Sequence, residues 1–405
     1  MLKRTIFFLI ILVTLAACGP DITPTPTLSP TQMIPVLPTA ISTSVPTQTP
    51  IPSATPTLRP TIATTVPINP AAGYGPTNFP TGVDPLTGLA VSNPDLLNRR
   101  PIVIKVENLP RNARPQFGLS LADIVYEYYT ELGGTRFASV FYGQDAKEVG
   151  PVRSARFFDF NVVQMYKGVF AFGYAYADLF SAIMNSDFHN RVLLEGTGSS
   201  PALFRVQPNG PNYLMVNMLE LPAVLKNKNI DNSKQNLVGM SFNKTVPAGG
   251  NPVKQVYVRY SGAIYNRWDY DPASNQYLRF EDAADDPNRN NEVYTQLTDQ
   301  LTSKTISADN VAMVFVDHKY VMKTTTTEVF NMNLIGEGKA YVARDGQLFQ
   351  VKWKRANQTD VMAFVNADGS PFALKPGHTW VEVLGTSSTI TDLKNGAYKF
   401  TWLIP

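Results

Sequence analysis

Cysteine is almost absent from this chain of 405 residues, in which Cys18 is the only one. The folded part therefore cannot contain an internal disulfide, and its stability depends on burial of a core. Histidine is also scarce, and His189, His318 and His378 are scattered along the sequence without a local set of ligand partners. Because a zinc site needs three or four converging ligands, the sequence predicts no metal site, and we expect no cofactor.

Blocks of like charge are missing as well. The chain carries 35 Lys and Arg against 32 Asp and Glu, with no basic tail. This balance argues against nucleic acid as a partner. Familiar catalytic motifs are also absent: no G-x-S-x-G elbow occurs, and the segment GTGSSP at 196–201 lacks the lysine of a phosphate-binding loop.

The one long apolar run lies at the N-terminus, where MLKR precedes TIFFLIILVTLAA. This run is too short for a membrane-spanning helix and is typical of a secretory signal peptide. It ends in LAAC, which resembles the lipobox of bacterial lipoproteins. We therefore expect a signal peptide over 1–17, lipidation of Cys18 by palmitate-type chains, and an extracytoplasmic protein anchored to the cell membrane. An ordinary signal peptide followed by a chance cysteine is the alternative.

A proline-rich tract follows the predicted signal peptide. From residue 18 to about residue 80 the sequence repeats Thr-Pro, as in TPTPTLSPTQ, with few charges and almost no aromatic residues. Proline removes amide donors and fixes φ, so neither helix nor sheet propagates through such a segment. We expect residues 18–80 to form a disordered stalk that holds the folded part away from the membrane.

The rest of the chain is long enough for two domains. Over 81–238 predicted strands and helices interleave, which indicates a mixed α/β domain. Two β-rich runs on either side of Gly133-Gly134 predict a hairpin with a two-residue turn. The other predicted elements are strands at 102–106 and 168–176 and helices at 154–166, 177–185 and 216–229, with Ser154 and Asn217 as helix caps.

From 239 to 405 strands dominate, separated by turns such as Asp345-Gly346 and Asp368-Gly369. This pattern predicts a second, mostly antiparallel β domain, so the fold class is α+β. The acidic segment EDAADDPNRNNE at 281–292 lacks the glycine and the spacing of an EF-hand calcium loop. We interpret it as a solvated loop.

Arginine supplies the most conspicuous candidate site. Arg153 and Arg156 flank Ser154 in the segment GPVRSAR, and Arg114 and Arg136 follow other predicted turns. In a functional interpretation, these guanidinium groups and the backbone amides at the start of the predicted helix bind a phosphate or carboxylate of a ligand.

A structural interpretation competes with this one, and we favour it while both stay open. Arg153 and Arg156 would pair with Asp123 and Glu127, because the planar guanidinium holds a carboxylate with two hydrogen bonds. These pairs would lock the hairpin to the helix. Arg156, placed inside the predicted helix, is expected to contribute more to stability than Arg153.

Aromatic residues crowd the same region, and most of them are expected in the core. Tyr174 and Tyr176 follow a glycine at the end of a predicted strand, where α/β folds place ligands, so we expect these two to be exposed and to bind a ligand. Asp178 begins the next helix and would face the same crevice. Together with Asp123 and Glu127 it is a candidate catalytic acid or base.

Two long segments of this chain resemble one family, the DUF3048 or YerB-like bacterial lipoproteins. The N-terminal domain of the family is similar to RPIVIKVENLPRNARPQFGLSLADIVYEYYTELGGTRFASVFYG and GPVRSAR, and its C-terminal domain is similar to GKAYVARDGQLFQVKWKR with GHTWVEVL. The resemblance implies an architecture and an envelope location, because the family is largely without an assigned reaction. Histidines expected of the family after GPVRSAR and near the middle β hairpin are missing, which argues against a shared histidine mechanism.

Two functions of different classes follow from these observations. The first, which we favour, is a non-catalytic binding or regulatory module of the cell envelope that recognises peptidoglycan, another wall polymer or a wall-modifying protein. The second is a hydrolase or transferase that acts on an anionic glycan or peptide, with the arginines as a clamp and two carboxylates as acid and base.

Overall fold

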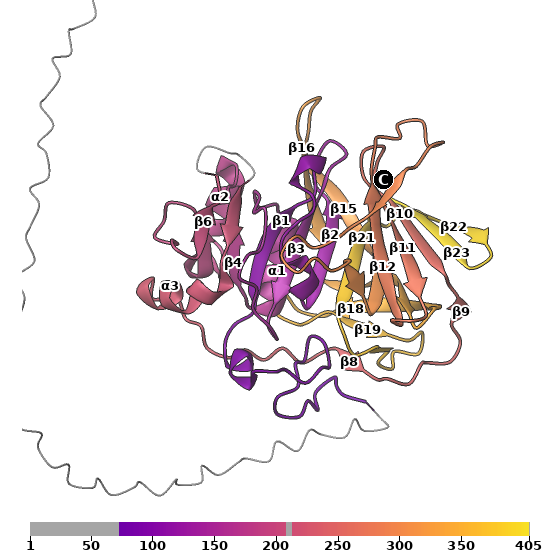
Figure 1. Ribbon diagram of the computed structural model, residues 1–405, viewed down its shortest axis with the longest axis horizontal. Helices are drawn as coiled ribbons and strands as arrows, with labels where there is room; N and C mark the ends of the chain where they lie inside the picture. Colours follow the sequence, from indigo (N-terminus) through magenta and orange to yellow (C-terminus); the bar gives the residue numbers. More distant parts are fainter. Residues whose placement is uncertain (1–72, 208–212, 405) are drawn as a thin grey trace, which may run out of the picture. The chain divides into compact units, whose positions relative to one another are not determined.

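The computed structural model describes residues 73–207 and 213–404, and these belong to one compact unit (Figure 1). The predicted signal peptide, Cys18 and most of the predicted stalk lie outside the described residues. None of the helices within the described ranges has the length and apolar character needed to cross a bilayer. The fold is α+β, as predicted, with few helices and many strands.

A sheet of 12 strands forms the centre of the molecule. Its middle strands are buried along their whole length, which is expected where both faces of a sheet are covered. In sheet order the strands are β19 (Ala363–Val365), β18 (Gln347–Arg355), β17 (Gly336–Arg344), β15 (Asn310–Lys323), β21 (Thr379–Gly385), β2 (Ile124–Tyr129), β3 (Thr135–Phe141), β1 (Ile102–Glu107), β4 (Val169–Phe172) and β5 (Val192–Leu194), with β16 (Glu328–Asn333) beside β15 and β9 (Asn251–Pro252) beside β18.

This sheet includes strands from both sides of the predicted domain boundary at residue 239. β2 pairs in parallel with β21, so that Tyr126 lies opposite Val381 and Glu127 opposite Glu382. The two regions of sequence therefore share one continuous sheet, and neither contains a complete copy of it.

A second sheet of seven strands packs against the first. Between the two sheets the rings of Trp268 and Trp380 meet at a centroid distance of 5.2 Å, and Phe137 contacts Trp380 at 5.1 Å. Its strands are β13 (Tyr294–Gln296), β12 (Gln276–Asp282), β11 (Tyr265–Asp271), β10 (Gln255–Arg259), β23 (Ala397–Thr401), β22 (Thr389–Lys394) and β14 (Ser307–Ala308). Two small sheets pair β8 (Ser241–Phe242) with β20 (Ala373–Leu374) and β6 (Leu203–Arg205) with β7 (Leu214–Val216).

Three α-helices lie within residues 73–207 and 213–404, namely α1 (Phe158–Tyr166), α2 (Ala177–Met184) and α3 (Leu221–Asn227). α1 covers β2, because its first residue, Phe158, packs on the ring of Tyr128 at 4.3 Å. α3 follows a single 3-10 turn whose cap is Asn217, the residue predicted for this role.

The predicted start of the first helix is wrong. Ser154 does not cap it, since residues 153–155 are extended and α1 begins at Phe158. Backbone hydrogen bonds account for the difference: the amide of Arg153 donates to Lys105, and the amide of Ala155 donates to Tyr174. The segment is thus held between the end of β1 and the end of β4, and this tertiary pairing overrides the local capping signal.

The turn between β2 and β3 is also longer than predicted. It spans residues 130–134 instead of the two glycines alone, and Leu132 and Gly133 adopt φ values of 48° and 85°. Glycine suits this turn because L side chains rarely adopt such a positive φ. The longer turn carries Glu131, which becomes important at the site.

The polar connection after α3 packs on the body of the protein. Leu237 and Met240 are buried, and the amide of Gly239 donates to the carbonyl of Pro76. Arg100 forms an ion pair with Asp231 at the beginning of this segment. These contacts explain how a sequence without hydrophobic periodicity stays ordered between two regions of different composition.

Candidate functional site

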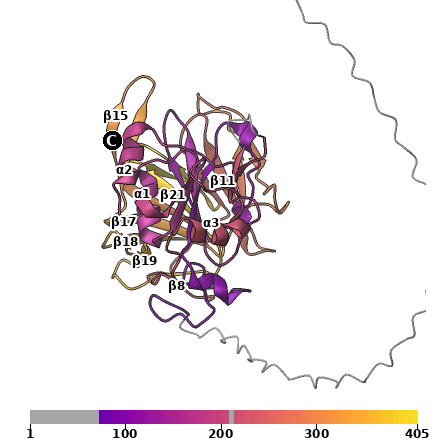
Figure 2. The same ribbon diagram turned by 90° about the vertical axis from the view of Figure 1, so that its left-hand side faces the viewer.

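A pocket of about 430 Å³ is lined by residues that follow β4, by residues at the start of α2 and by residues of the β15–β16 hairpin. The ribbon in Figure 2 labels α2 and β15, which contribute to this lining. Five residues singled out from the sequence line this Tyr174 pocket: Ser154, Arg156, Tyr174, Tyr176 and Asp178. The other lining residues are Glu131, Met322, Thr326, Thr327, Glu328 and Val329.

Backbone pairing brings these residues together from distant positions. The amide of Ala155 donates to the carbonyl of Tyr174 at 2.8 Å, and the amide of Gly173 donates to the carbonyl of Arg153 at 2.9 Å. Gly173 suits this close approach, because a Cβ there would make a tight contact of 3.3 Å with the carbonyl oxygen of Val152. This pairing places residues 153–155 beside the end of β4, directly before Tyr174 and Tyr176.

Arg156 is engaged within the protein. Its Nε donates to Glu131 Oε2 at 2.5 Å, its Nη2 donates to Oε1, and its Nη1 donates to the carbonyl of Ala155 at 2.7 Å. Arg136 also donates to Glu131, at 3.2 Å. Burial raises the pKa of Glu131, but hydrogen bonding from Arg156 and the two positive charges outweigh it, so that the net pKa is lowered.

The other two predicted arginines bind different carboxylates. Arg153 forms an ion pair with Glu107, whose side chain is fully buried at the end of β1. Arg114 lies 2.9 Å from Glu281 and 3.0 Å from Asp282. Neither Arg153 nor Arg114 lines the Tyr174 pocket, so the four arginines do not converge on one ligand. The interpretation of 281–292 as a solvated loop is wrong at Glu281, Asp282 and Asp286, because these side chains are buried and form ion pairs with arginines.

The predicted partners of the arginines, Asp123 and Glu127, are held elsewhere, and that pairing is wrong. Asp123 accepts a hydrogen bond from the amide of Gly143 at 3.0 Å. Glu127 accepts from Arg279 at 2.5 Å. Both carboxylates are buried and neither lines the Tyr174 pocket. Of the three candidate catalytic residues, only Asp178 does.

Glu127 belongs to a charge cluster between the two sheets. Arg279 contacts Glu127, Glu281 and Glu382, and all four side chains are almost completely inaccessible. Burial raises the pKa of Glu127 to about 8, and the nearby carboxylates add to this effect while Arg279 opposes it. One guanidinium facing three carboxylates therefore offsets only part of the cost of burying Glu127, and its pKa stays above the ordinary value.

A second buried charge lies behind the pocket. Lys105 on β1 is 3.2 Å from Asp159, and Asp159 also accepts hydrogen bonds from the hydroxyl of Tyr128 and from the amide of Arg156. Burial lowers the pKa of Lys105 to about 7, the positive charge of Arg136 adds to this, and Asp159 opposes it. Asp159 thereby ties the chain before α1 to β1 and β2.

Tyr174 is exposed, as expected from the sequence, whereas Tyr176 is only partly exposed and packs against the core. Tyr126 and Tyr128 are buried, whereas Tyr174 is 64% exposed and Tyr176 is half-buried. Tyr176 packs edge-on against Phe157 at 6.4 Å. Tyr174 thus presents an exposed ring at a pocket whose polar side chains come from four segments of the chain.

The wall of the pocket that β16 forms was not predicted from the sequence. Glu328 lines the pocket, accepts a hydrogen bond from Tyr129 at 2.6 Å and accepts another from the amide of Leu132 at 2.8 Å. In the sequence, the signal for this strand was the alternation of apolar and polar residues over 330–333. It is weak, because the strand is short and follows a run of four threonines.

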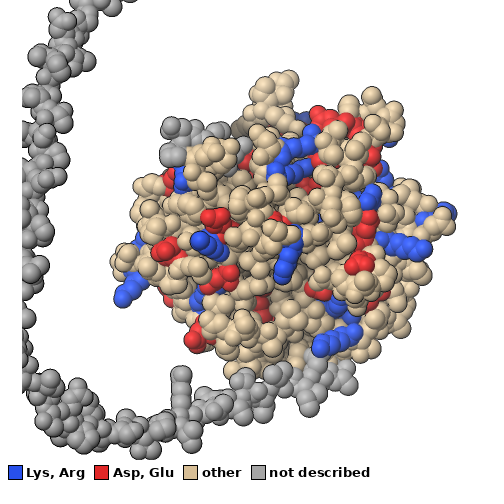
Figure 3. Space-filling model, viewed as in Figure 1, with Lys and Arg blue, Asp and Glu red and all other residues tan. Residues whose placement is uncertain are grey.

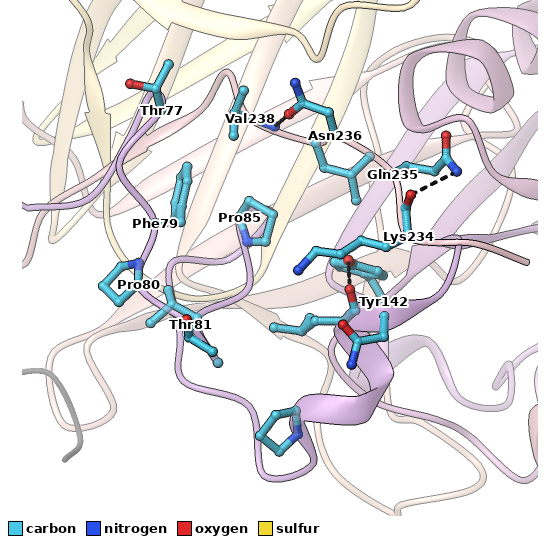
Figure 4. Close-up of a pocket in the computed structure, with 16 residues that line it drawn as sticks. Thr77, Phe79, Pro80, Thr81, Pro85, Tyr142, Lys234, Gln235, Asn236 and Val238 are labelled. Carbon is cyan, nitrogen blue, oxygen red and sulfur yellow. Dashed lines mark hydrogen bonds between the residues drawn. The ribbon is translucent and has the colours of Figure 1, made fainter. Parts of the chain in front are cut away.

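Another pocket, of about 330 Å³, lies between residues 77–98 and the connection at 234–238 (Figure 4). Its polar groups satisfy one another: the hydroxyl of Tyr142 donates to the carbonyl of Leu97, and the amide of Val238 donates to Asn236. Lys234 is its only charged lining residue. It offers fewer reactive groups than the Tyr174 pocket.

On the face of the molecule shown in Figure 3, basic and acidic side chains are interspersed. Within residues 73–207 and 213–404, no three histidine, cysteine, aspartate or glutamate side chains converge as metal ligands. The Tyr174 pocket is instead a cleft lined by two tyrosines and by the carboxylates of Glu131, Asp178 and Glu328.

Comparison with known proteins identifies the class. Residues 86–231 match the N-terminal domain of DUF3048, a protein family of unknown function, and residues 256–381 match its C-terminal domain. The chain belongs to this family.

Among its relatives, the chain is similar to the "Putative lipoprotein YerB" of Bacillus subtilis strain 168. The two are 28% identical over 307 residues, which covers 74% of this chain and 85% of that protein. The crystal structure of YerB from the same organism superposes with a TM-score of 0.61 at 25% identity, covering 74% of this chain and 96% of that one. The fold described above is thus shared with YerB.

Proposed function

We propose that this protein is a lipid-anchored, extracytoplasmic binding protein of the cell envelope, and that the Tyr174 pocket recognises a hydroxyl-rich ligand such as a wall glycan. The lipobox at Cys18 and the lipoprotein name of the related YerB support the location. The observation that carries the binding role is the meeting of an exposed tyrosine ring with carboxylate side chains in one pocket.

Sugar rings have apolar faces that stack on aromatic side chains and hydroxyl groups that donate to carboxylates. Tyr174 provides such a ring, and Glu131, Asp178 and Glu328 provide acceptors from three different segments. Anion recognition by Arg156 has less support, because its guanidinium already donates to Glu131 and to a backbone carbonyl.

Hydrolysis of the same ligand is the second candidate, because carboxylates from different elements line the pocket. A glycosidase needs one carboxyl group that stays protonated to serve as general acid. Glu131 is poorly suited to this role, since its pKa is lowered. Hydrolysis therefore has no support from Glu131, and binding without cleavage is the proposal we favour.

The test is calorimetric titration of the full chain with soluble peptidoglycan fragments. Tyr174→Ala should weaken binding by about fivefold or more, because stacking on an aromatic ring contributes about 1 kcal/mol or more. Tyr213→Ala, at an exposed tyrosine outside the pocket, is the matched control and should bind like the wild type.

Two other results would decide against this proposal. Equal binding by the wild type and Tyr174→Ala would remove the pocket from recognition. Release of reducing ends by the wild type, abolished in Asp178→Asn, would establish the hydrolase instead.

A further inference from the structure

Two buried aspartates face a separate small pocket, which is distinct from the Tyr174 pocket. It has a volume of about 230 Å³ and lies between residues 84–92, the chain after β3, and the residue before β21. Asp84 and Asp123 line it, with exposed fractions of 0% and 2%. The other lining residues are Thr87, Leu89, Ala90, Val91, Ser92, Gly143, Gln144 and His378.

Asp84 has one oxygen satisfied and one without a donor. Its Oδ1 accepts a hydrogen bond from the amide of Leu86 at 2.7 Å. Its Oδ2 is buried and has no hydrogen-bond partner among the described residues, although the Thr87 hydroxyl lies beside the carboxyl group. A buried carboxylate oxygen without a donor is costly, so this site is incomplete as it stands.

Gly143 leaves open the space between the two carboxyl groups. A Cβ on this residue would lie 2.6 Å from Asp84 Oδ2 and 3.3 Å from Asp123 Oδ1. Both oxygens therefore reach the same small volume. Asp123 is oriented by its other oxygen, Oδ2, which accepts from the amides of Tyr142 and Gly143.

No lysine or arginine among the described residues forms an ion pair with either aspartate. Arg99 is the nearest guanidinium that acts on Asp123, and it is paired with Asp145 at 2.6 Å. His378 also faces Asp123, but its Nδ1 is 2.6 Å from the carbonyl of Ala122 and its amide donates to Asp309. The phenol of Tyr142 is the remaining titratable group that acts on Asp84.

These surroundings favour the neutral forms of the two carboxyl groups when no cation is bound. Burial raises the pKa of Asp84 well above its usual value, and the charge of Asp123 raises it further. Burial also raises the pKa of Asp123, and His378 opposes that effect. A cation bound between them would favour the ionised forms instead.

We propose that this pocket binds a primary alkylammonium group, such as the amine of a lysine-like side chain. The ammonium group has three N–H donors, which match Asp84 Oδ2, Asp123 Oδ1 and the Thr87 hydroxyl. The methylene groups of the ligand lie along Leu89 and Val91. A bare metal ion is less suited, because no set of three metal-ligating side chains converges in the described part of the chain.

The test is titration of the full chain with n-pentylammonium chloride. We expect saturable binding, with n-pentanol and tetramethylammonium as controls that lack either the charge or the N–H donors. Asp84→Asn and Asp123→Asn should each lower the affinity by about tenfold or more, as expected for loss of a hydrogen bond to a charged group. Asp368→Asn, in an exposed turn, should bind like the wild type.

The pH dependence provides a second measurement on the unmodified protein. Affinity should rise with pH until the ligand itself deprotonates near about pH 10, because the ligand binds the ionised carboxylates and their pKa values are raised. If an aspartate variant fails to fold, the amide NMR signals of Leu86 and Gly143 in the wild type should still shift with pentylammonium and not with pentanol.

Absence of saturable binding by the wild type would overturn the proposal. Unchanged affinity in folded Asp84→Asn would do so as well, and tighter binding of calcium than of pentylammonium would identify a metal site instead. These outcomes are independent of the Tyr174 pocket, so either proposal can fail without the other.

Discussion

Arg279 on β12 and Glu127 on β2 form an ion pair at 2.5 Å, and both side chains are completely buried between the two sheets. The pair joins residues that are 152 positions apart in the sequence. Glu382 on β21 lies 3.1 Å from the same guanidinium, and its other oxygen accepts from the hydroxyl of Tyr260 at 3.0 Å. One arginine thus ties the seven-stranded sheet to adjacent strands of the 12-stranded sheet.

Replacing this arginine should be severely destabilising. Arg279→Met leaves three buried carboxylates without their cation, and we expect a loss of about 3–5 kcal/mol in the free energy of unfolding. Arg267→Met is the matched control on the neighbouring strand, because Arg267 is partly exposed, and it should cost less than about 1 kcal/mol. Urea unfolding of both variants at neutral pH makes the comparison; equal losses would contradict the role given to Arg279.

Glu127 should make the stability depend on pH. Its pKa in the folded state is raised to about 8 from an ordinary value of 4.5, so the folded protein keeps a proton that the unfolded chain loses. The contribution of Glu127 therefore becomes less favourable as pH rises from about 4.5 to about 8. Glu127→Gln stays neutral and should gain stability relative to the wild type between pH 5 and pH 9. Unfolding curves at both pH values check this, and an unchanged difference would show that Glu127 is ionised throughout.

Arg153 should matter more than Arg156, the reverse of what the sequence predicts. Arg153→Ala leaves Glu107 fully buried without its arginine, and we expect a loss of about 3 kcal/mol or more. Arg156→Ala should cost less, because Glu131 is 25% exposed and keeps Arg136. A double-mutant cycle with Glu107→Gln should recover part of the loss, whereas additive losses would exclude a direct interaction.

The two regions of sequence should not fold separately. Residues 81–238 made alone lose the pairing of β2 with β21, and Glu127 loses Arg279, so the fragment should be unfolded by circular dichroism. Residues 239–405 alone lose the same interface. A cooperative thermal transition in either isolated fragment would show that the shared sheet is not needed for stability.

Lipidation of Cys18 should determine whether the protein is recovered with the membrane. Cys18→Ala removes the only thiol, so no lipid can be attached, and the protein should move from the membrane fraction to the soluble extracytoplasmic fraction. Fractionation followed by immunoblotting makes the measurement. Full retention in the membrane fraction would refute anchoring through Cys18.

The sequence by itself determined the parts of this protein that depend on local rules. Apolar alternation predicted β1, the glycine at 133 predicted the β2–β3 turn, and Asn217 predicted a helix cap, because propensity and capping act within a few residues. The sequence also predicted that Tyr174, Tyr176 and Asp178 face one crevice, because a strand end and the following helix are adjacent in the chain. All three residues line the Tyr174 pocket.

Only the tertiary structure decided which charges meet. Arg153 pairs with Glu107, Arg156 with Glu131, and Glu127 with Arg279. No sequence rule places any of these pairs together. An ion pair depends on distance in space and on exclusion of water, and both are set by how the sheets pack. The same holds for Asp84 and Asp123, whose carboxyl groups share a pocket because the glycine between them has no side chain.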